Sequence, residues 1–245
     1  MQVDRRATLL WIVASLSVTV AGAAARAECP ALLKDAHRVL VVATPDMRSV
    51  EASLRRFERA PDRSWRQVGG AVPAVVGLTG LGWAAGEAAA PAGEPRKQEG
   101  DKRTPAGLFR LGRPFGRAPA SFPGYLRLEP DRDICVDDPS SPHYGEIIPR
   151  TGDPTAHGED MGRVSLYRRG FVIDTPILAA RRGGSCIFLH VWRGPESGTV
   201  GCVATAEGAV ATLQNWARPG DVVAILPKAQ ADEVLACLGA PAASP

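Results

Sequence analysis

The segment 185–192, with the sequence SCIFLHVW, limits the possible folds of this chain more than any other. It reads as an apolar strand, and side chains on a strand alternate between two faces. The alternation gives two sets, Cys186, Phe188, His190 and Trp192 on one face and Ile187, Leu189 and Val191 on the other. Both sets are largely apolar, so we expect a central strand that is covered on both sides and carries a histidine near its end.

Further short apolar runs, separated by turns, predict a protein rich in strands. Glycine (26 residues) and proline (21 residues) are plentiful, which suits a chain with frequent turns. The strand candidates are 38–43, 49–59 paired with 64–68 as a hairpin, 73–78, 108–111, 125–128, 164–173 and 221–226. The helices that we expect are 206–217, with Thr205 as its N-cap, and 232–238. This pattern favours a mainly β fold with a few short helices (α+β), built as a β-sandwich or barrel.

Two segments predict loops. Residues 96–107 (RKQEGDKRTPAG) are polar, and residues 131–161 show little periodicity. Irregular segments as long as the second one are uncommon unless they cover or bind something. We therefore expect residues 131–161 to form a long, lid-like loop that faces a substrate.

The chain begins with the features of a secretory signal peptide. Arg5 and Arg6 precede an apolar run over residues 7–21, and Ala25-Arg26-Ala27 offers small residues for cleavage. The apolar run is shorter than the ~20 residues of a membrane span, which favours cleavage over an uncleaved anchor. We predict a signal peptide over residues 1–27 and a single exported domain over residues 28–245, in the periplasm or cell envelope and without a stable membrane span.

The net charge argues against nucleic acid as a partner. The whole chain has a formal charge of +3, and loss of three arginines and one aspartate with the signal peptide leaves +1. Nucleic-acid binding relies on clustered Lys and Arg side chains that neutralise phosphates. A nearly neutral exported domain does not fit that class.

The five cysteines leave at least one thiol unpaired. They are Cys29, Cys135, Cys186, Cys202 and Cys237. An exported chain meets an oxidising environment, so disulfides are permitted. Cys29 and Cys237 lie near the two ends of the exported domain, and we predict that they pair. If Cys202 is the free thiol, the other four cysteines still allow three connectivities, and disulfide exchange is disfavoured because no Cys-x-x-Cys pair occurs.

Cys202 and His190 form a candidate nucleophile and base. They are twelve positions apart, on two elements that can fold face to face. The histidine and a nearby helix N-terminus would both favour the thiolate. Backbone N–H groups around Gly201 and Cys202 would be free to bind an oxyanion. The alternative is structural, because histidines on apolar strands are more often core residues and single cysteines are more often buried or bridged.

Several separated segments resemble the catalytic domain of the L,D-transpeptidases, the YkuD-type family. The strand-end histidine and the Ser/Thr-x-Gly-Cys-(Val/Ile) motif of that family correspond here to His190 and to Thr199-Val200-Gly201-Cys202-Val203. The loop 97–107, the segment 184–190 and Glu159-Asp160-Met161 are also similar. The resemblance covers roughly residues 39–226, which we take as the core of the domain.

The resemblance implies an L,D-transpeptidase-like β-sandwich and a cysteine acyltransferase that needs no cofactor. Cys202 would attack the carbonyl between the third and fourth residues of a peptidoglycan stem peptide, and terminal D-alanine would leave. His190, oriented by a backbone carbonyl as is frequent in the family, would carry the proton, with Gly201 and Thr199 as oxyanion and supporting residues. The acceptor would be an amine of another stem, a D-amino acid, a cell-envelope protein or water.

Two alternatives to a transpeptidase stay open. The first is an L,D-carboxypeptidase or amidase on the same scaffold, with water as the acceptor. The second is a non-catalytic domain that binds the cell wall. Many relatives carry an arginine two residues after the cysteine, where this chain has Ala204, and Cys186 replaces the usual alanine.

The segment 131–161 also holds candidate substrate contacts. His143 and His157 lie there among several aspartates, and we predict that these two histidines contact the substrate. Metal binding is the alternative, but the spacings match no strong metal motif such as His-Glu-x-x-His, so we expect no metal.

Overall fold

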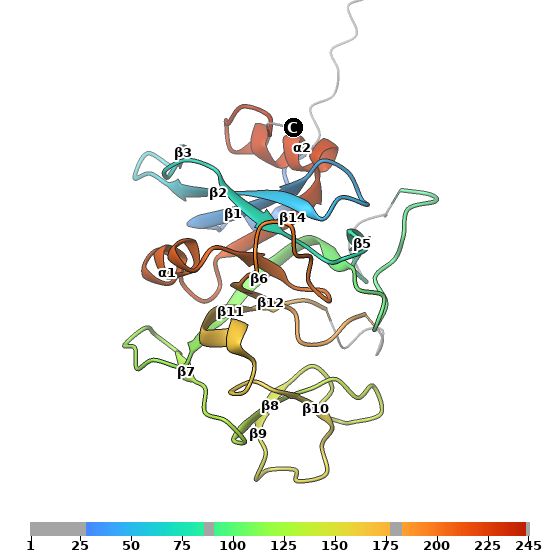
Figure 1. The fold of residues 1–245 in the computed structure, drawn as a ribbon. Coiled ribbons are helices and arrows are strands. Elements are labelled where there is room, and N and C mark those ends of the chain that lie inside the picture. Colours follow the sequence, from blue (N-terminus) through green and yellow to red (C-terminus); the bar gives the residue numbers. More distant parts are fainter. Residues whose placement is uncertain (1–27, 86–90, 177–182, 244–245) are drawn as a thin grey trace, which may run out of the picture.

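The computed structural model describes residues 28–85, 91–176 and 183–243 (Figure 1). The predicted signal peptide, residues 1–27, lies outside this range. In the described part of the chain, none of the helices is both long and apolar enough to span a membrane. The elements in chain order are η1 (Ala31–Leu33), β1 (Arg38–Thr44), β2 (Glu51–Arg59), β3 (Trp65–Gln67), β4 (Val72–Val75), β5 (Leu81–Trp83), β6 (Thr104–Gly116), β7 (Leu126–Arg127), β8 (Asp133–Val136), β9 (Ile147–Pro149), β10 (Gly158–Asp160), η2 (Ser165–Arg168), β11 (Arg169–Asp174), β12 (Phe188–Val191), β13 (Val203–Thr205), α1 (Glu207–Trp216), β14 (Val222–Pro227) and α2 (Lys228–Cys237), where η marks a short 3₁₀ helix.

The main sheet closes on itself as a barrel. Its strands follow the order β1-β14-β6-β11-β12-β13-β4-β2, and β2 pairs back with β1. Closure depends on β6, which is 13 residues long and pairs with β14 through its first half and with β11 through its second. The mainly β, α+β prediction is confirmed, but one closed sheet stands in place of the two sheets of the expected sandwich.

The strand predicted to be central is central. β12 lies between β11 and β13, antiparallel to the first and parallel to the second. Ile187, Leu189 and Val191 point into the main core, whereas Phe188 belongs to a second apolar cluster with Cys202. The two faces of this strand therefore build two separate cores, as the alternation of its side chains indicated.

Residues 131–161, the predicted lid-like loop, contain a small sheet of three short strands joined by turns and irregular segments. β8 lies between β9 and β10 and is antiparallel to both. In Figure 1 this sheet lies at the end of the molecule opposite α2. Its strands have three or four residues each, too few for an alternating pattern to stand out in the sequence.

Several element boundaries differ from the prediction. β6 covers Thr104–Gly116, so it is longer than the expected strand 108–111 and begins inside the expected loop 96–107. Residues 165–168 of the expected strand 164–173 form η2, and only the rest belongs to β11. Thr205 ends β13 and its hydroxyl donates to the Pro73 carbonyl at 2.6 Å, so it does not cap α1. The N-cap is Ala206, without a side-chain hydrogen bond. α2 begins at Lys228, four residues before the expected start, and packs against β14 and β1.

Both disulfides are formed. Cys29 pairs with Cys237, as predicted, Cys135 pairs with Cys186, and Cys202 is the free cysteine. The first bond ties the start of the described chain to the end of α2. The second joins the small sheet to the residues that lead into β12.

Loss of the Cys29–Cys237 bond is expected to destabilise the whole domain. The two cysteines are 208 positions apart, and removal of a native bridge typically costs about 2–5 kcal/mol because the unfolded chain gains freedom. We expect a loss in this range for the Cys29→Ser, Cys237→Ser double variant, measured by urea unfolding.

The matched control is the Cys135→Ser, Cys186→Ser double variant. This bond spans only 51 positions, and the chain-entropy argument predicts a loss about 1 kcal/mol smaller. An equal or larger loss would contradict that argument for this chain.

Candidate active site

A cavity of about 700 Å³ lies over the ends of β12 and β13. Both Cys202 and His190 line it, so the structure brings the predicted nucleophile and base to one site. Its other lining residues come from the turn 196–201, from η2, from the small sheet and the residue that follows β8, from residues 185–187 and 192–193 on either side of β12, from β13, and from Leu78 and Glu99. Those used below are Glu99, Asp137, Glu159, Tyr167, Arg193, Glu196, Thr199, Gly201 and Ala204.

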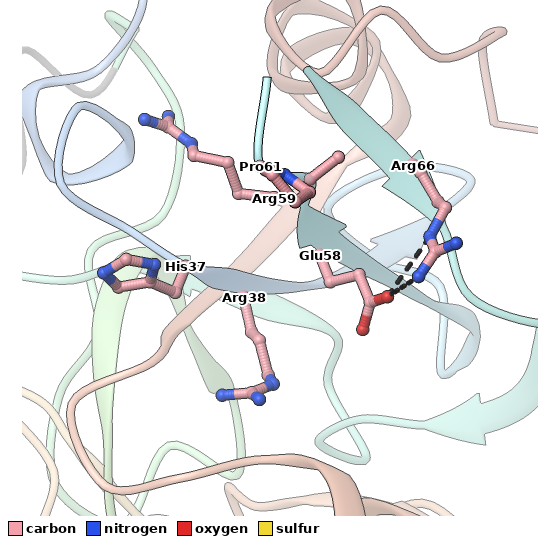
Figure 2. Close-up of a pocket in the computed structure, with 7 residues that line it drawn as sticks. His37, Arg38, Glu58, Arg59, Pro61 and Arg66 are labelled. Carbon is pink, nitrogen blue, oxygen red and sulfur yellow. Dashed lines mark hydrogen bonds and ion pairs between the residues drawn. The ribbon is translucent and has the colours of Figure 1, made fainter. Parts of the chain in front are cut away.

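A second pocket lies on the opposite part of the barrel and holds no nucleophile. His37, Arg38, Glu58, Arg59 and Arg66 line it together with Ala60 and Pro61 (Figure 2). Arg66 pairs with Glu58, Arg38 lies 3.9 Å from an Asp221 carboxylate oxygen, and Arg59 donates to the carbonyls of Leu33 and Lys34. We therefore place the chemistry in the first pocket.

The parallel pairing of β12 and β13 sets the positions of the two reactive side chains. Leu189 is in register with Val203 and His190 with Ala204, which brings Cys202 next to Phe188. The backbone N–H of Phe188 hydrogen-bonds the Cys202 sulfur. The thiol is thus held against the strand that carries the histidine.

His190 is buried and oriented by the backbone. Its Nδ1 lies 2.8 Å from the Val191 carbonyl oxygen, and a carbonyl can only accept, so we assign the proton to Nδ1. Nε2 then keeps its lone pair. Burial lowers the pKa of His190 from 6.5 to about 4, which leaves the ring neutral and able to take a proton at neutral pH.

Cys202 is a neutral thiol in this structure. Its pKa is raised from 9.0 to about 12, mainly by burial and to a smaller extent by the Glu159 carboxylate, whereas the Phe188 N–H, the Tyr167 hydroxyl and Lys97 lower it. The sulfur donates to the Cys186 carbonyl at 3.5 Å. The sequence analysis expected groups that favour the thiolate, but the net shift favours the thiol because burial has the largest effect. β13 separates Cys202 from the start of α1.

Thr199 and Gly201 shape the turn that carries the thiol. The Thr199 hydroxyl donates to the Cys202 carbonyl at 2.6 Å and accepts the Gly201 N–H at 3.1 Å. Thr104 donates to the same carbonyl at 2.9 Å, a contact that the sequence did not suggest. Thr199 thus holds the carbonyl of Cys202, and the Gly201 N–H, which the sequence analysis offered to an oxyanion, is bonded to the Thr199 hydroxyl.

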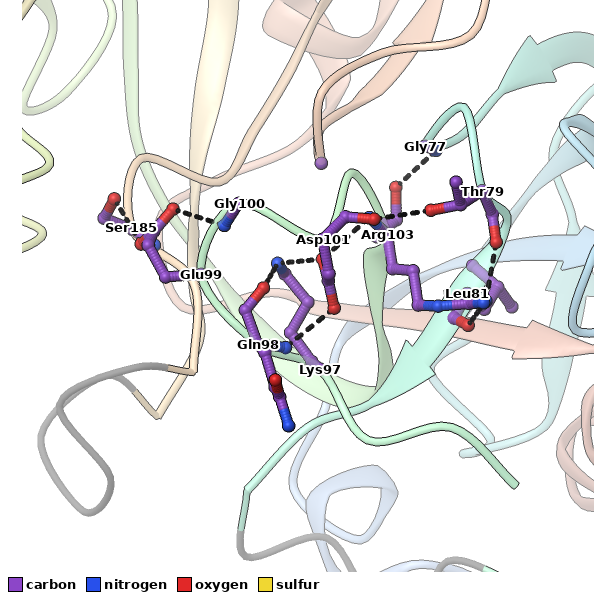
Figure 3. Close-up of polar contacts among 12 residues, drawn as sticks. Gly77, Thr79, Leu81, Lys97, Gln98, Glu99, Gly100, Asp101, Arg103 and Ser185 are labelled. Carbon is purple, nitrogen blue, oxygen red and sulfur yellow. Dashed lines mark hydrogen bonds and ion pairs between the residues drawn. The ribbon is translucent and has the colours of Figure 1, made fainter. Parts of the chain in front are cut away.

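The loop that precedes β6 braces the entry to β12. Asp101 accepts from Lys97 and from the backbone of Gln98 and Arg103 at 2.6–2.8 Å, which fixes the loop (Figure 3). Glu99 then accepts from both the N–H and the hydroxyl of Ser185 at 2.8 Å and from the Tyr144 hydroxyl. One carboxylate thus joins the loop, the small sheet and the segment next to Cys186.

The two histidines that were predicted to contact the substrate lie outside the pocket. Neither His143 nor His157 lines the pocket: His143 pairs with Glu146 at 3.0 Å, and His157 is exposed. The small sheet instead contributes Asp137 and Glu159, which the sequence analysis missed. Glu159 and Glu99 both lie in segments that resemble the family, and this resemblance could have identified them as candidate site residues.

The pocket lacks the arginine that many relatives carry two residues after the cysteine. Ala204 lines it, and among the described lining residues Arg193 carries the positive charge. In the described part of the chain, no group of three or more His, Cys, Asp or Glu side chains is placed to hold a metal ion.

Comparison with known proteins gives one match. The family model of the L,D-transpeptidase catalytic domain, YkuD, matches residues 66–225, which is more than half of the chain. No curated protein and no solved structure matches.

Acid is expected to destabilise the fold through His190. In the unfolded chain this histidine takes up a proton near pH 6.5, whereas in the folded chain it does so only near pH 4. Stability is therefore lost as the pH falls from 6.5 towards 4, by about 3 kcal/mol. Urea unfolding at pH 7 and pH 4 measures this loss, and His190→Gln should lack it. An equal loss in both proteins would assign the effect to other groups.

Substitution of Gly201 is expected to disturb the nucleophile. Its φ of +150° lies in a region that other residues adopt at a cost of about 1–3 kcal/mol. We expect Gly201→Ala to lose stability in this range and to change the alkylation rate of Cys202. Gly208→Ala in α1 is the control, because open space surrounds that position and alanine favours a helix. Equal effects of the two substitutions would contradict the assignment.

Proposed function

The chain belongs to the L,D-transpeptidase catalytic-domain family, YkuD, and on that premise we propose that it is an exported cysteine acyltransferase acting on peptidoglycan stem peptides. The observation that carries the proposal is the orientation of His190. Its Nδ1 is bound to the Val191 carbonyl, which leaves Nε2 as a base in the pocket that holds the free Cys202 thiol.

The first half-reaction would acylate Cys202. The sulfur attacks the carbonyl carbon of the third stem residue, and the thiol proton passes to Nε2 of His190 as the C–S bond forms. Nε2 then gives this proton to the leaving nitrogen as the C–N bond breaks, and D-alanine departs. Because both groups are neutral at rest, the proton moves during the attack and not before it.

The second half-reaction would transfer the acyl group. An amine attacks the thioester carbon, Nε2 takes a proton from its nitrogen, and the C–S bond breaks as the proton returns to the sulfur. The products are a new amide and the free thiol. Arg193 is the one lysine or arginine among the described lining residues, and in the absence of an arginine at position 204 it would receive a substrate carboxylate.

Water as the acceptor would make the same site a carboxypeptidase or amidase. The chemistry up to the thioester is identical, so the choice depends on whether the pocket admits an amine or water. The non-catalytic alternative gains no specific support, because it gives no reason for a free thiol beside an oriented imidazole.

The proposed location is the periplasm or cell envelope. Two disulfides support it, because such bonds persist in oxidising compartments and are rare in the cytosol. The composition of residues 1–27 is consistent with export.

Mass spectrometry with a tetrapeptide muropeptide and with a carbapenem tests the proposal. We expect an acyl adduct on Cys202, no adduct in Cys202→Ala, and acylation slowed by about 10²–10⁴-fold in His190→Ala. His37→Ala, an exposed histidine outside the pocket, is the control and should react like the wild type.

The products of the reaction with the muropeptide identify the acyl acceptor. A cross-linked dimer indicates transpeptidation, and a shortened stem without a cross-link indicates hydrolysis. A folded protein with a reduced Cys202 that forms neither adduct nor product would favour the non-catalytic domain.

A further inference from the structure

Glu159 is a pocket carboxylate that the two half-reactions do not use. It lies on β10 of the small sheet, is partly buried and lines the pocket. Its Oε2 accepts a hydrogen bond from the Tyr167 hydroxyl at 2.6 Å. Packing alone does not explain a partly buried carboxylate that lies against an apolar cluster and accepts a hydrogen bond from a phenol.

Tyr167 connects this carboxylate to both reactive groups. Its hydroxyl also interacts with the Cys202 thiol, and its ring meets the His190 ring edge to face with centroids 5.1 Å apart. Tyr167 is only 5% exposed and packs edge to face on Phe115 and Phe188, so the ring has little room to turn. A phenol has one hydrogen to donate, and in this structure the Tyr167 hydroxyl donates it to Glu159. The same hydroxyl lowers the pKa of Cys202, so Glu159 and the sulfur compete for this one hydrogen.

We propose that Glu159 is a positioning residue that sets the reactivity of Cys202 through the Tyr167 hydroxyl. The ionised carboxylate holds the phenol hydrogen away from the sulfur and places a negative charge near it. When Glu159 takes up a proton from solvent, the hydrogen bond to the phenol loses its charge assistance, which roughly halves its strength. The phenol hydrogen can then turn to the thiolate or to an oxyanion. Only O–H bonds change in this step.

The surrounding charges favour such a switch. Burial and the Asp137 carboxylate raise the pKa of Glu159, and the Tyr167 hydroxyl opposes them. Glu159 in turn raises the pKa of Cys202. Among the described residues, the other charged or titratable groups that line the pocket are His190 on β12, Glu99 on the loop before β6, and Arg193 and Glu196 after β12. Lys97 on the loop before β6 lowers the pKa of Cys202.

The test measures the alkylation of Cys202 by iodoacetamide in the full chain with both disulfides intact, from pH 5 to pH 9, by intact mass. At pH 8 we expect Glu159→Gln to react about tenfold faster than the wild type, equivalent to one pKa unit of the thiol. In a Tyr167→Phe background the same substitution should change the rate less than threefold. Glu196→Gln is the control, because it removes the same charge from the pocket but Glu196 makes no hydrogen bond to Tyr167 among the described residues.

The pH profile separates this role from a structural one. The wild-type rate should rise with pH, level off over the titration of Glu159, and then rise again, and this inflection should be absent in Glu159→Gln and in Tyr167→Phe. Asp137→Asn keeps both partners and should move the inflection to lower pH, which preserves the test if Glu159→Gln does not fold.

Three results would overturn the proposal: an equal effect of Glu159→Gln with and without the Tyr167 hydroxyl, no acceleration in Glu159→Gln, or an inflection that Asp137→Asn does not move. The catalytic meaning of the switch rests on the proposed function, but alkylation needs no substrate. A protein that shows the coupling and turns over no stem peptide would refute the proposed function alone.

Discussion

Burial of Cys202 and His190 governs the rest of this site. In an exposed pair, a thiolate and an imidazolium attract each other and keep their own geometry. Here desolvation raises the pKa of the thiol and lowers that of the imidazole, so no such attraction exists at neutral pH. Position must come from the backbone: the register of β12 with β13, the carbonyl that holds Nδ1 of His190, and the Thr199 and Thr104 hydroxyls that fix the Cys202 carbonyl.

The small sheet is part of the active site because it is fastened to the barrel beside the thiol. Cys135 of β8 is bonded to Cys186, whose carbonyl accepts from Cys202. Tyr144 reaches Glu99 on the loop before β6, and Glu159 of β10 accepts from Tyr167 on η2. These three links surround one cavity, so a displacement of the small sheet would move the acceptor of the thiol hydrogen and the carboxylate near the sulfur together.

The sequence predicted the elements with strong local signals and missed those set by tertiary contacts. β12 followed from seven alternating side chains, and the Cys29–Cys237 bond followed from the positions of the two cysteines near the ends of the domain. The strands of the small sheet are too short to show an alternating pattern in the sequence. Closure of the barrel depends on pairings between strands that are distant in the sequence. Cys202 and His190 stood out because both residue types are chemically distinctive. Glu159 did not stand out, because glutamates are common in polar segments of a sequence. Only the fold shows that this one is partly buried against Tyr167.

A neutral resting pair makes proton transfer from Cys202 to His190 uphill by several pKa units, so the thiolate cannot accumulate before a substrate binds. The site is thereby protected from indiscriminate reaction with electrophiles, which would matter for a free cysteine in the oxidising compartment that we propose. The same protection must be lifted when a substrate enters. A bound peptide removes water and supplies a carbonyl on which the charge can settle, and a phenol released by Glu159 can donate to that charge. Reactivity would then depend on occupancy of the pocket and on the proton carried by Glu159, whereas the thiol alone stays inert.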